Sequence, residues 1–172
     1  MHLFQRAIVL GSPGAGKSTF ARALRDVTGL PLHHLDLLWH KLDRTTVSRE
    51  EFDAKLQDIL AGDRWIIDGN YNRTIEMRLK CCDAVFLLDL PLEVCLASIE
   101  ARIGTEREDM PWVETEFDSE FRQFVLDFPQ KGLPCVYELI EQYRAGKTVV
   151  IFKSREEINA YLRGLEKGET YG

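Results

Sequence analysis

The fold of this chain is decided by residues 11–18, Gly11-Ser12-Pro13-Gly14-Ala15-Gly16-Lys17-Ser18. The stretch fits the pattern G-x-x-x-x-G-K-[ST] at every position, which is typical of a loop that binds phosphates between a strand and a helix. Its glycines let the backbone curl until successive N–H groups point at one anion. Lys17 can then reach the outer phosphates, and the Ser18 hydroxyl can bind Mg²⁺. We therefore expect the residues from Gly11 to Thr19 to hold a nucleotide.

The segments on either side of this loop have the order that the pattern requires. Residues 4–10 indicate a short buried strand directly before it. After it, apolar side chains recur at the i, i+3, i+4, i+7 spacing of an amphipathic helix, at Phe20, Ala23, Leu24 and Val27. The alternative is a glycine-rich turn that binds nothing, and the order of strand, loop and helix disfavours it.

Length and composition are those of one globular domain. The chain has 172 residues, of which 45% are hydrophobic and 29% are charged. No apolar run approaches the roughly 18 residues of a membrane-spanning helix, and the first residues lack the pattern of a secretory signal. The cysteines, at Cys81, Cys82, Cys95 and Cys135, show no C-x-x-C spacing. We therefore expect reduced thiols in a cytoplasmic protein without a membrane partner.

Charge and histidine content disfavour two classes of partner. The formal net charge is −6, which is a poor match for duplex nucleic acid, so direct binding to nucleic acid is not expected. His33 and His34 lie together in an expected strand, with no third ligand at metal spacing, so we expect no zinc site. We expect one of the two histidines to be buried and hydrogen-bonded, and the other to be half exposed. The oligomeric state is left open.

Strand and helix patterns alternate along the whole chain. Further strands are expected at residues 32–35, 65–68, 84–89 and 147–152. Residues 37–47 are expected to be irregular. Ser48 with Glu51, and Ser154 with Glu157, each predict the start of a helix. This alternation predicts a three-layer α/β fold of the P-loop type, in which a five-stranded parallel sheet carries helices on both faces.

Acidic residues end three of the expected strands, at Asp36, Asp68 and Asp89. Ligands of parallel sheets bind beyond the carboxyl ends of the strands, so these side chains are expected near the phosphate loop. Mg²⁺ in such a site takes a carboxylate together with phosphate oxygens and water. Asp68 is the expected carboxylate. Asp36 is the alternative, or it accepts a hydrogen bond from a substrate hydroxyl, and Asp89 is explained by ending its strand.

Arginine is the residue that clamps phosphate with two parallel hydrogen bonds, and charge neutralisation dominates phosphoryl transfer. Arg73 follows the turn after the third strand, and Arg102 ends the helix after the fourth. We expect both in the crevice. Arg107, in the polar loop that follows, is equally consistent with the crevice and with solvent. The helical arginines expected in solvent are Arg22, Arg25 and Arg78.

Three more residues are expected near the crevice. Asn70 lies in the turn after the third strand, and Trp39 and Tyr71 are aromatic residues of expected loops. Each aromatic side chain either packs in the core or stacks on a substrate base. The acidic residues between Glu106 and Asp118 predict a solvated face.

The order of three motifs carries a family resemblance. They are the phosphate loop, Trp65-Ile66-Ile67-Asp68-Gly69 and Phe86-Leu87-Leu88-Asp89-Leu90-Pro91. This order resembles that of the adenylate kinase-like nucleoside and small-molecule kinases. The resemblance implies that Asp68 acts on magnesium through water, that Arg73 is the clamping arginine after a one-residue insertion, and that Arg102 is a lid arginine. Ser98 stands where adenylate kinases carry an arginine against the adenine, which leaves base selectivity open.

A second resemblance covers nearly the whole chain. Its segments are HHLDLLWHK (33–41), WIIDGNYNRTIEMRL (65–79), VFLLDLPLEVCL (85–96) and FVLDFPQKGLPCVYELIEQY (124–143). They resemble the bacterial P-loop proteins labelled DNA topology modulation proteins. The label implies a role in DNA supercoiling or in flagellar gene expression, whereas the acidic charge and the lack of a basic stripe disfavour direct DNA binding.

These patterns predict an ATP-dependent kinase that moves the γ-phosphoryl group of Mg-ATP to a small acceptor, with a nucleoside monophosphate as one candidate. ATP is expected over GTP because no Asn-Lys-x-Asp tetrad occurs. The alternatives are a nucleotide-dependent regulator of DNA topology or gene expression with weak ATPase activity, and a simple ATPase.

The expected roles divide within a single domain over residues 1–172. Residues 37–62 form an acceptor-binding insertion, and residues 103–112 form a short lid. The residues expected to act in catalysis are Lys17, Arg102, Arg73 and Asp68. Those expected to bind the acceptor are Asp36, Trp39, Asn70 and Arg73, and those expected to bind magnesium are Ser18 and Asp68.

Overall fold

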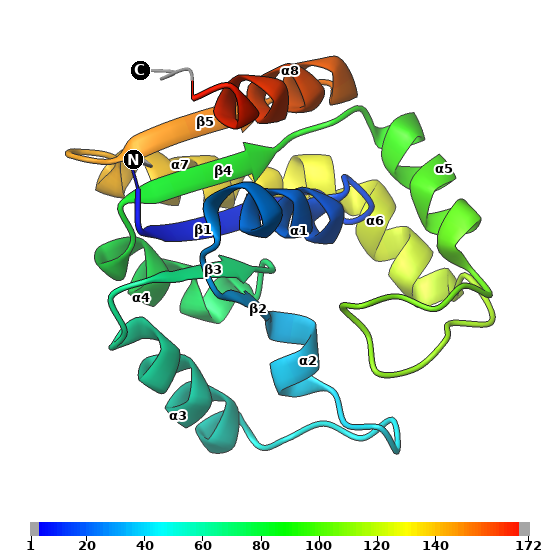
Figure 1. The fold of residues 1–172 in the computed structure, drawn as a ribbon. Helices are drawn as coiled ribbons and strands as arrows, with labels where there is room; N and C mark the ends of the chain where they lie inside the picture. The colour runs from blue at the N-terminus through cyan, green and yellow to red at the C-terminus, as the bar shows by residue number, and fades with distance from the viewer. Residues whose placement is uncertain (1–3, 169–172) are drawn as a thin grey trace.

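The structure is a computed structural model that describes residues 4–168. Its five strands form one sheet in which every pair is parallel, in the order β2-β3-β1-β4-β5 (Figure 1). The strands are β1 (Arg6–Gly11), β2 (Leu32–His34), β3 (Trp65–Asp68), β4 (Ala84–Leu88) and β5 (Thr148–Phe152). The predicted fold class and strand number are confirmed.

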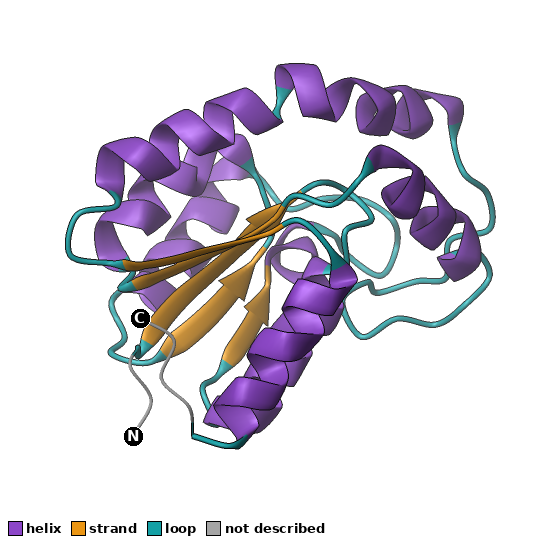
Figure 2. Ribbon diagram, turned by 90° about the horizontal axis from the view of Figure 1, so that it is seen from above, coloured by secondary structure: helices purple, strands orange, loops and turns teal. Residues whose placement is uncertain are grey.

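Helices cover both faces of this sheet, which lies between them when seen from above (Figure 2). They are α1 (Lys17–Thr28), α2 (Leu35–Trp39), α3 (Arg49–Leu60), η1 (Asn72–Thr74), α4 (Ile75–Cys81), α5 (Leu92–Arg102), α6 (Ser119–Lys131), α7 (Leu133–Tyr143) and α8 (Arg155–Glu166). α1 packs against α8 and α4 packs against α7. Among residues 4–168, no helix is long and apolar enough to cross a membrane.

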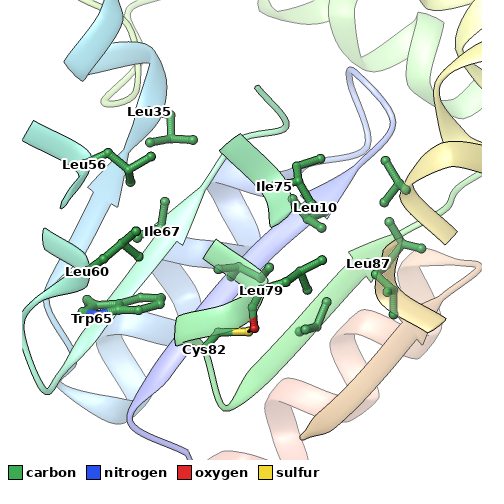
Figure 3. Close-up of a cluster of buried hydrophobic side chains, with 14 of the residues drawn as sticks. Leu10, Leu35, Leu56, Leu60, Trp65, Ile67, Ile75, Leu79, Cys82 and Leu87 are labelled. Carbon is green, nitrogen blue, oxygen red and sulfur yellow. Dashed lines mark hydrogen bonds between the residues drawn. The ribbon is translucent and has the colours of Figure 1, made fainter. Parts of the chain in front are cut away.

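The core follows from the alternation of side chains along each strand. One set of strand residues faces α4 and α7, with Leu10 beside Ile75 of α4 and Leu87 in the same buried cluster (Figure 3). The next residues along the same strands face α1 and α8, where the buried cluster includes Val9, Phe20, Leu24, Phe86, Ile158 and Tyr161. Burying such side chains stabilises the fold by about 1.5–3 kcal/mol each. The two clusters hold the carboxyl ends of the strands in register.

The second strand is shorter than predicted, and the segment after it is helical. β2 ends at His34, which pairs in register with Asp68, the last residue of β3. With no partner beyond this point the chain turns into α2, whose first turn holds Asp36. The prediction that residue 35 is in a strand and that residues 37–47 are irregular was wrong for α2. Its i, i+3, i+4 apolar spacing buries Leu35 and packs Leu38 and Trp39 on the core.

The loop after α5 is longer than the predicted lid. It runs from residue 103 to residue 118, and α6 begins at Ser119 after Asp118, whose carboxylate accepts a hydrogen bond from the Phe121 N–H at 3.2 Å. The predicted helix caps at Ser48 and Ser154 are confirmed, since each hydroxyl accepts a hydrogen bond from a backbone N–H three residues later, at 3.1 and 3.2 Å.

Candidate active site

Two glycines of the phosphate loop combine a positive φ with a lack of room for a Cβ atom. Gly11 has a φ of 152° and Gly14 a φ of 81°. A Cβ atom on Gly11 would lie 2.4 Å from the carbonyl oxygen of Leu88, and one on Gly14 would lie 2.4 Å from that of Cys95. The glycines of the motif therefore allow the loop to curl and also allow it to pack closely against β4 and α5.

The side chain of Lys17 folds back onto the phosphate loop and donates to its backbone. Its Nζ atom donates to the carbonyl oxygens of Gly11 at 3.1 Å and Ser12 at 3.0 Å. Burial lowers the pKa of Lys17, while the charges of Asp68 and Asp36 act to raise it. Lys17 is also the first residue of α1, so the positive end of the helix dipole faces the same space. The arrangement fits the phosphates of a nucleotide.

A cavity of about 720 Å³ opens at the carboxyl ends of the strands, within the usual size range of small-ligand sites. It brings together most of the predicted site residues, namely Pro13, Gly14, Gly16, Lys17, Ser18, Thr19, Asp36, Asp68, Asn70 and Arg102. Arg107 and Tyr71 also line it. Gly11, Ser12 and Ala15 form the buried back of the loop. Arg73 and Trp39 are not among the lining residues.

Asp68 lies at the floor of this cavity in a buried pair with His34. The Nδ1 atom of His34 is 2.5 Å from Oδ2 of Asp68, and the two residues are 6% and 5% exposed. Because an ionised carboxylate only accepts, Nδ1 is the donor. Burial acts to lower the pKa of His34, but the hydrogen bond and charge of Asp68 outweigh it and the pKa is raised. The prediction of one buried, hydrogen-bonded histidine is confirmed, and His33 is half-buried.

Magnesium fits the donor set at this point. The Ser18 hydroxyl and the Asp68 carboxylate line the same cavity beside the phosphate loop. Mg²⁺ prefers oxygen ligands and is usually held by one or two carboxylates, phosphate oxygens and several waters. Within residues 4–168 there is no cluster of three histidine, cysteine or acidic side chains that could hold a metal without a nucleotide.

Asp36 faces the cavity from α2 and is held by Tyr71. The Tyr71 hydroxyl donates to Oδ1 of Asp36 at 2.6 Å. Burial raises the pKa of Asp36, and the charge of Asp68 adds to the effect, although the Tyr71 bond opposes it. The Tyr71 ring stacks on Phe52 of α3, with centroids 5.2 Å apart and planes at 26°. The carboxylate of Asp36 is therefore held in place, and its second oxygen can accept a hydrogen bond from a ligand.

Hydrogen bonds from two side chains, Asn70 and Arg78, hold the turn between β3 and η1 in place. Asn70 exchanges two hydrogen bonds with the backbone of Gly11, accepting at 3.1 Å and donating at 2.7 Å. The Arg78 guanidinium donates to the carbonyl of Gly69 at 2.8 Å, to the Asn70 carbonyl, and to the Thr74 hydroxyl at 3.2 Å. The turn is thus joined to the phosphate loop by Asn70 and to α4 by Arg78.

Arg78 was predicted to lie in solvent, and this was wrong, because its side chain is 0% exposed. Burial lowers its pKa, against the charge of Asp68. A signal for its burial was present in the sequence. Arg78 lies one helical turn after Ile75 and directly before Leu79, on the stripe of α4 that faces the core.

Two residues expected to bind the acceptor, Arg73 and Trp39, make other contacts and do not line the cavity. The Arg73 guanidinium pairs with both carboxylate oxygens of Asp53 on α3, at 3.0 and 2.7 Å, on the exposed surface. The Trp39 ring packs edge-on against Phe52, with centroids 5.6 Å apart. Of the two interpretations of Trp39, this contact favours packing over stacking on a ligand.

Two arginines, Arg102 at the end of α5 and Arg107 in the loop at residues 103–118, are paired with carboxylates of that loop, which is called the lid here. Glu114 lies 3.6 Å from Nε of Arg102 and 3.8 Å from Nη1 of Arg107, and Asp109 lies 3.5 Å from Nε of Arg107. Asp109 is 7% exposed, so the prediction of a solvated acidic face was wrong at this residue. Both arginines line the cavity and have anionic partners in positions that a phosphate can take.

The lid also makes contacts that sequence patterns did not predict. Glu108 lies 3.3 Å from Arg22 and 3.2 Å from Arg25 on α1, so these arginines are paired rather than free in solvent. The Trp112 ring meets the His40 ring edge-on, with centroids 5.1 Å apart. These residues therefore join the loop after α5 both to α1 and to the loop after α2.

Asp89 does not line the cavity. Its Oδ2 accepts hydrogen bonds from the Tyr137 hydroxyl at 2.6 Å and from Nζ of Lys153 at 2.5 Å. The pairing joins the end of β4 to α7 and to the segment after β5. This contact agrees with the interpretation of Asp89 as a residue that ends its strand.

Known proteins resemble the chain in sequence over part of its length and in structure over nearly all of it. Adenylate kinases from Thermotoga petrophila and Thermotoga maritima are each 32% identical over 84 residues, which is 48% of this chain and 37% of those enzymes. The match thus spans just over a third of the length of these curated relatives. No protein-family model matches the chain.

Solved structures resemble it along nearly the whole length. A shikimate kinase from Bacteroides thetaiotaomicron has a TM-score of 0.56 at 16% identity, covering 95% of this chain and 97% of its own. A sugar kinase from Janibacter sp. HTCC2649 has a TM-score of 0.53 at 17% identity, covering 97% and 99%. The chain has the P-loop fold of the nucleoside monophosphate kinase type, and about half of it is similar in sequence to adenylate kinases.

Proposed function

We propose that this protein is a phosphotransferase that moves the γ-phosphoryl group of Mg-ATP to a small acceptor. One observation carries the proposal. A phosphate loop with its lysine, two lid arginines and a separate carboxylate that can meet an acceptor all line one cavity. A protein that only binds a nucleotide needs the loop, whereas transfer also needs the acceptor-facing group and cations over the moving phosphoryl.

The nucleotide end is formed by the phosphate loop and the first turn of α1. Backbone N–H groups and Lys17 bind the phosphates, and Ser18 and Asp68 hold the magnesium. The metal supplies charge neutralisation at the phosphate oxygens when it is bound. Within the protein, the His34 bond orients Asp68 so that one carboxylate oxygen stays directed away from the imidazole.

The transferred group meets Arg102 and Arg107. Phosphoryl transfer spreads negative charge over oxygens that a guanidinium can neutralise, so both arginines stabilise the transition state in this proposal. Because Glu114 pairs with both arginines, the incoming phosphate replaces that carboxylate. The lid then closes over the reacting groups and excludes water, which would otherwise accept the phosphoryl group.

The acceptor end lies at Asp36, in the cavity wall between α2 and the turn after β3. Asn70 lies in the same wall but uses its side chain on Gly11, so its role here is to position the turn. Arg73 can clamp an acceptor phosphate only after leaving Asp53. A nucleoside monophosphate therefore stays one candidate acceptor among several small molecules.

The test is ADP release from Mg-ATP, with and without a panel of nucleoside monophosphates, nucleosides and small alcohols. Stimulation by one acceptor, absent in Lys17→Ala and retained in the exposed-lysine control Lys55→Ala, is the expected result. Tight ATP binding with a flat panel would contradict the proposal and favour a nucleotide-dependent regulator.

A further inference from the structure

A row of phenylalanines runs from the lid to the core along α6. Phe117, Phe121, Phe124 and Phe128 follow one another with ring centroids 5.8, 6.4 and 5.9 Å apart. Phe128 is 2% exposed and belongs to the core, but Phe121 and Phe124 line the cavity, and Phe124 is 54% exposed. A large apolar ring exposed in a ligand cavity adds little to the core and instead offers an apolar surface to a ligand.

These two rings lie beside the expected position of the phosphoryl group. The guanidinium carbon of Arg102 is 5.9 Å from the centroid of the Phe121 ring. A molecule in contact with these rings is therefore next to the lid arginine that meets the moving phosphoryl group. The rings belong to the site of transfer rather than to a separate surface.

The charges around the acceptor end are mostly negative. Asp36 lies in that part of the wall, and the charge of the neighbouring Asp68 is already offset by its pairing with His34. Of the cations that line the cavity, Arg22 pairs with Glu108, and Arg102 and Arg107 pair with lid carboxylates that the γ-phosphoryl would replace. Arg155 donates to Ser98 of α5 at 2.6 Å, near Gly16 of the phosphate loop. A phosphate carried by the acceptor would therefore face the Asp36 carboxylate without a cation of its own.

We infer that the acceptor is an uncharged alcohol that carries a planar ring, with the ring against Phe121 and Phe124 and the hydroxyl at Asp36. This inference rests on the proposed function. In the transfer the hydroxyl oxygen forms a bond to the γ-phosphorus, and the bond from that phosphorus to the β–γ bridging oxygen breaks. ADP leaves with the bond's electron pair, and the hydroxyl proton goes to the Asp36 carboxylate. A nucleoside is a molecule of this chemical class.

Matched ligands test the inference. ADP release is measured with adenosine and thymidine, with their 5′-monophosphates, and with ribose, which lacks the planar ring. Binding of the same five molecules to the ADP-loaded protein is measured by calorimetry, so that binding is seen even without turnover. The nucleosides are expected to bind and to be phosphorylated, and the monophosphates and ribose are expected to do so at least roughly 5-fold less well.

Substitutions of Phe124 test whether its ring contacts the acceptor. Phe124→Leu removes the flat face but keeps an apolar side chain, and is expected to raise KM for the nucleoside by about 5-fold or more while KM for ATP is unchanged. Phe124→Tyr restores the ring and is expected to restore KM. Phe117→Leu, in the same row but outside the cavity lining, is the control and should leave both KM values unchanged.

The outcomes distinguish a failure of the inference about the acceptor from a failure of the proposed function. Monophosphates or ribose that act as well as the nucleosides would overturn the inference and leave the kinase intact. Nucleosides that fail to bind would also overturn it. Nucleosides that bind without any acceptor releasing ADP would overturn the proposed function, while the assignment of the ring site would stand.

Discussion

The side chain of Asn70 forms two hydrogen bonds with the backbone of a single residue, Gly11. Its Oδ1 accepts from the Gly11 N–H at 3.1 Å, and its Nδ2 donates to the Gly11 carbonyl at 2.7 Å. Gly11 is the first residue of the phosphate loop, and Asn70 is in the turn that follows Asp68. The pair therefore joins the phosphate loop to the turn that follows Asp68.

Replacing Asn70 should loosen the phosphate loop. Asn70→Ala removes two partly buried hydrogen bonds worth about 0.5–1.5 kcal/mol each, so ATP affinity is expected to fall by roughly 5- to 150-fold. Equilibrium titration with a fluorescent ATP analogue measures it. Asn72→Ala, at an exposed position of the same turn, is the matched control. Equal affinity in wild type and Asn70→Ala would show that the loop keeps its shape without this pair.

Replacing Arg78 should destabilise the whole fold. Its guanidinium donates to the Gly69 and Asn70 carbonyls in a fully buried position. Arg78→Met leaves these carbonyls without a donor, and we expect a loss of at least about 3 kcal/mol in the free energy of unfolding. Urea denaturation measures the loss, with the exposed Lys80→Met as control. A Met variant as stable as wild type would mean that apolar packing alone suffices at this position.

The stability contributed by His34 should depend on pH. Its pKa is raised in the folded state above the ordinary 6.5, so the charged pair with Asp68 contributes fully below pH 6.5. The contribution is lost as pH rises through the folded pKa. The stability difference between wild type and His34→Asn is expected to be about 1.5–3 kcal/mol at pH 6, and smaller at pH 9, by urea denaturation.

The pKa of His33 is shifted in the opposite direction to that of His34, so its contribution to stability should change with pH in the opposite sense. Burial, together with the charge of His34, lowers its pKa. The protonated form is therefore disfavoured in the folded state, and the contribution of His33 to stability grows as pH rises toward 6.5. A His34→Asn difference that does not change between pH 6 and 9 would contradict the charged pair.

Glu114 should compete with the nucleotide for the lid arginines. Glu114→Gln removes a partly exposed ion pair worth about 0.2–1 kcal/mol, so Arg102 and Arg107 become available to phosphate. ATP is expected to bind roughly 2- to 5-fold more tightly, and the gain should shrink as salt is added. The exposed Glu116→Gln in the same loop is the control. Weaker ATP binding in Glu114→Gln would show that Glu114 instead holds the lid in its working position.

Local signals in the sequence were enough to predict the frame of the site. The phosphate loop, the strand at residues 65–68 and the caps at Ser48 and Ser154 follow from contacts within a few residues of one another. The parallel sheet follows from the alternation of strands and helices. Because parallel strands end at one edge of their sheet, Lys17, Ser18, Asp36 and Asp68 could all be expected in one crevice.

Contacts between distant residues were harder to predict. The pairing of Arg73 with Asp53, and of Arg22 with Glu108, depends on how α3 and the lid pack on the rest of the molecule. A surface arginine has many possible partners of nearly equal energy, and sequence spacing does not choose among them. The burial of Arg78 was different, because the apolar stripe of α4 indicated it and the charge of the side chain outweighed that signal.

Transfer of a labelled phosphoryl group tests the central claim most directly. ATP carrying ¹⁸O in its γ-phosphoryl group is incubated with the protein, magnesium and the acceptor panel, and the products are identified by mass spectrometry. The label is expected on an acceptor, at a rate that falls by roughly 100-fold or more in Lys17→Ala and is unchanged in Lys55→Ala. Label found only in inorganic phosphate, or transfer that persists in Lys17→Ala, would contradict the account.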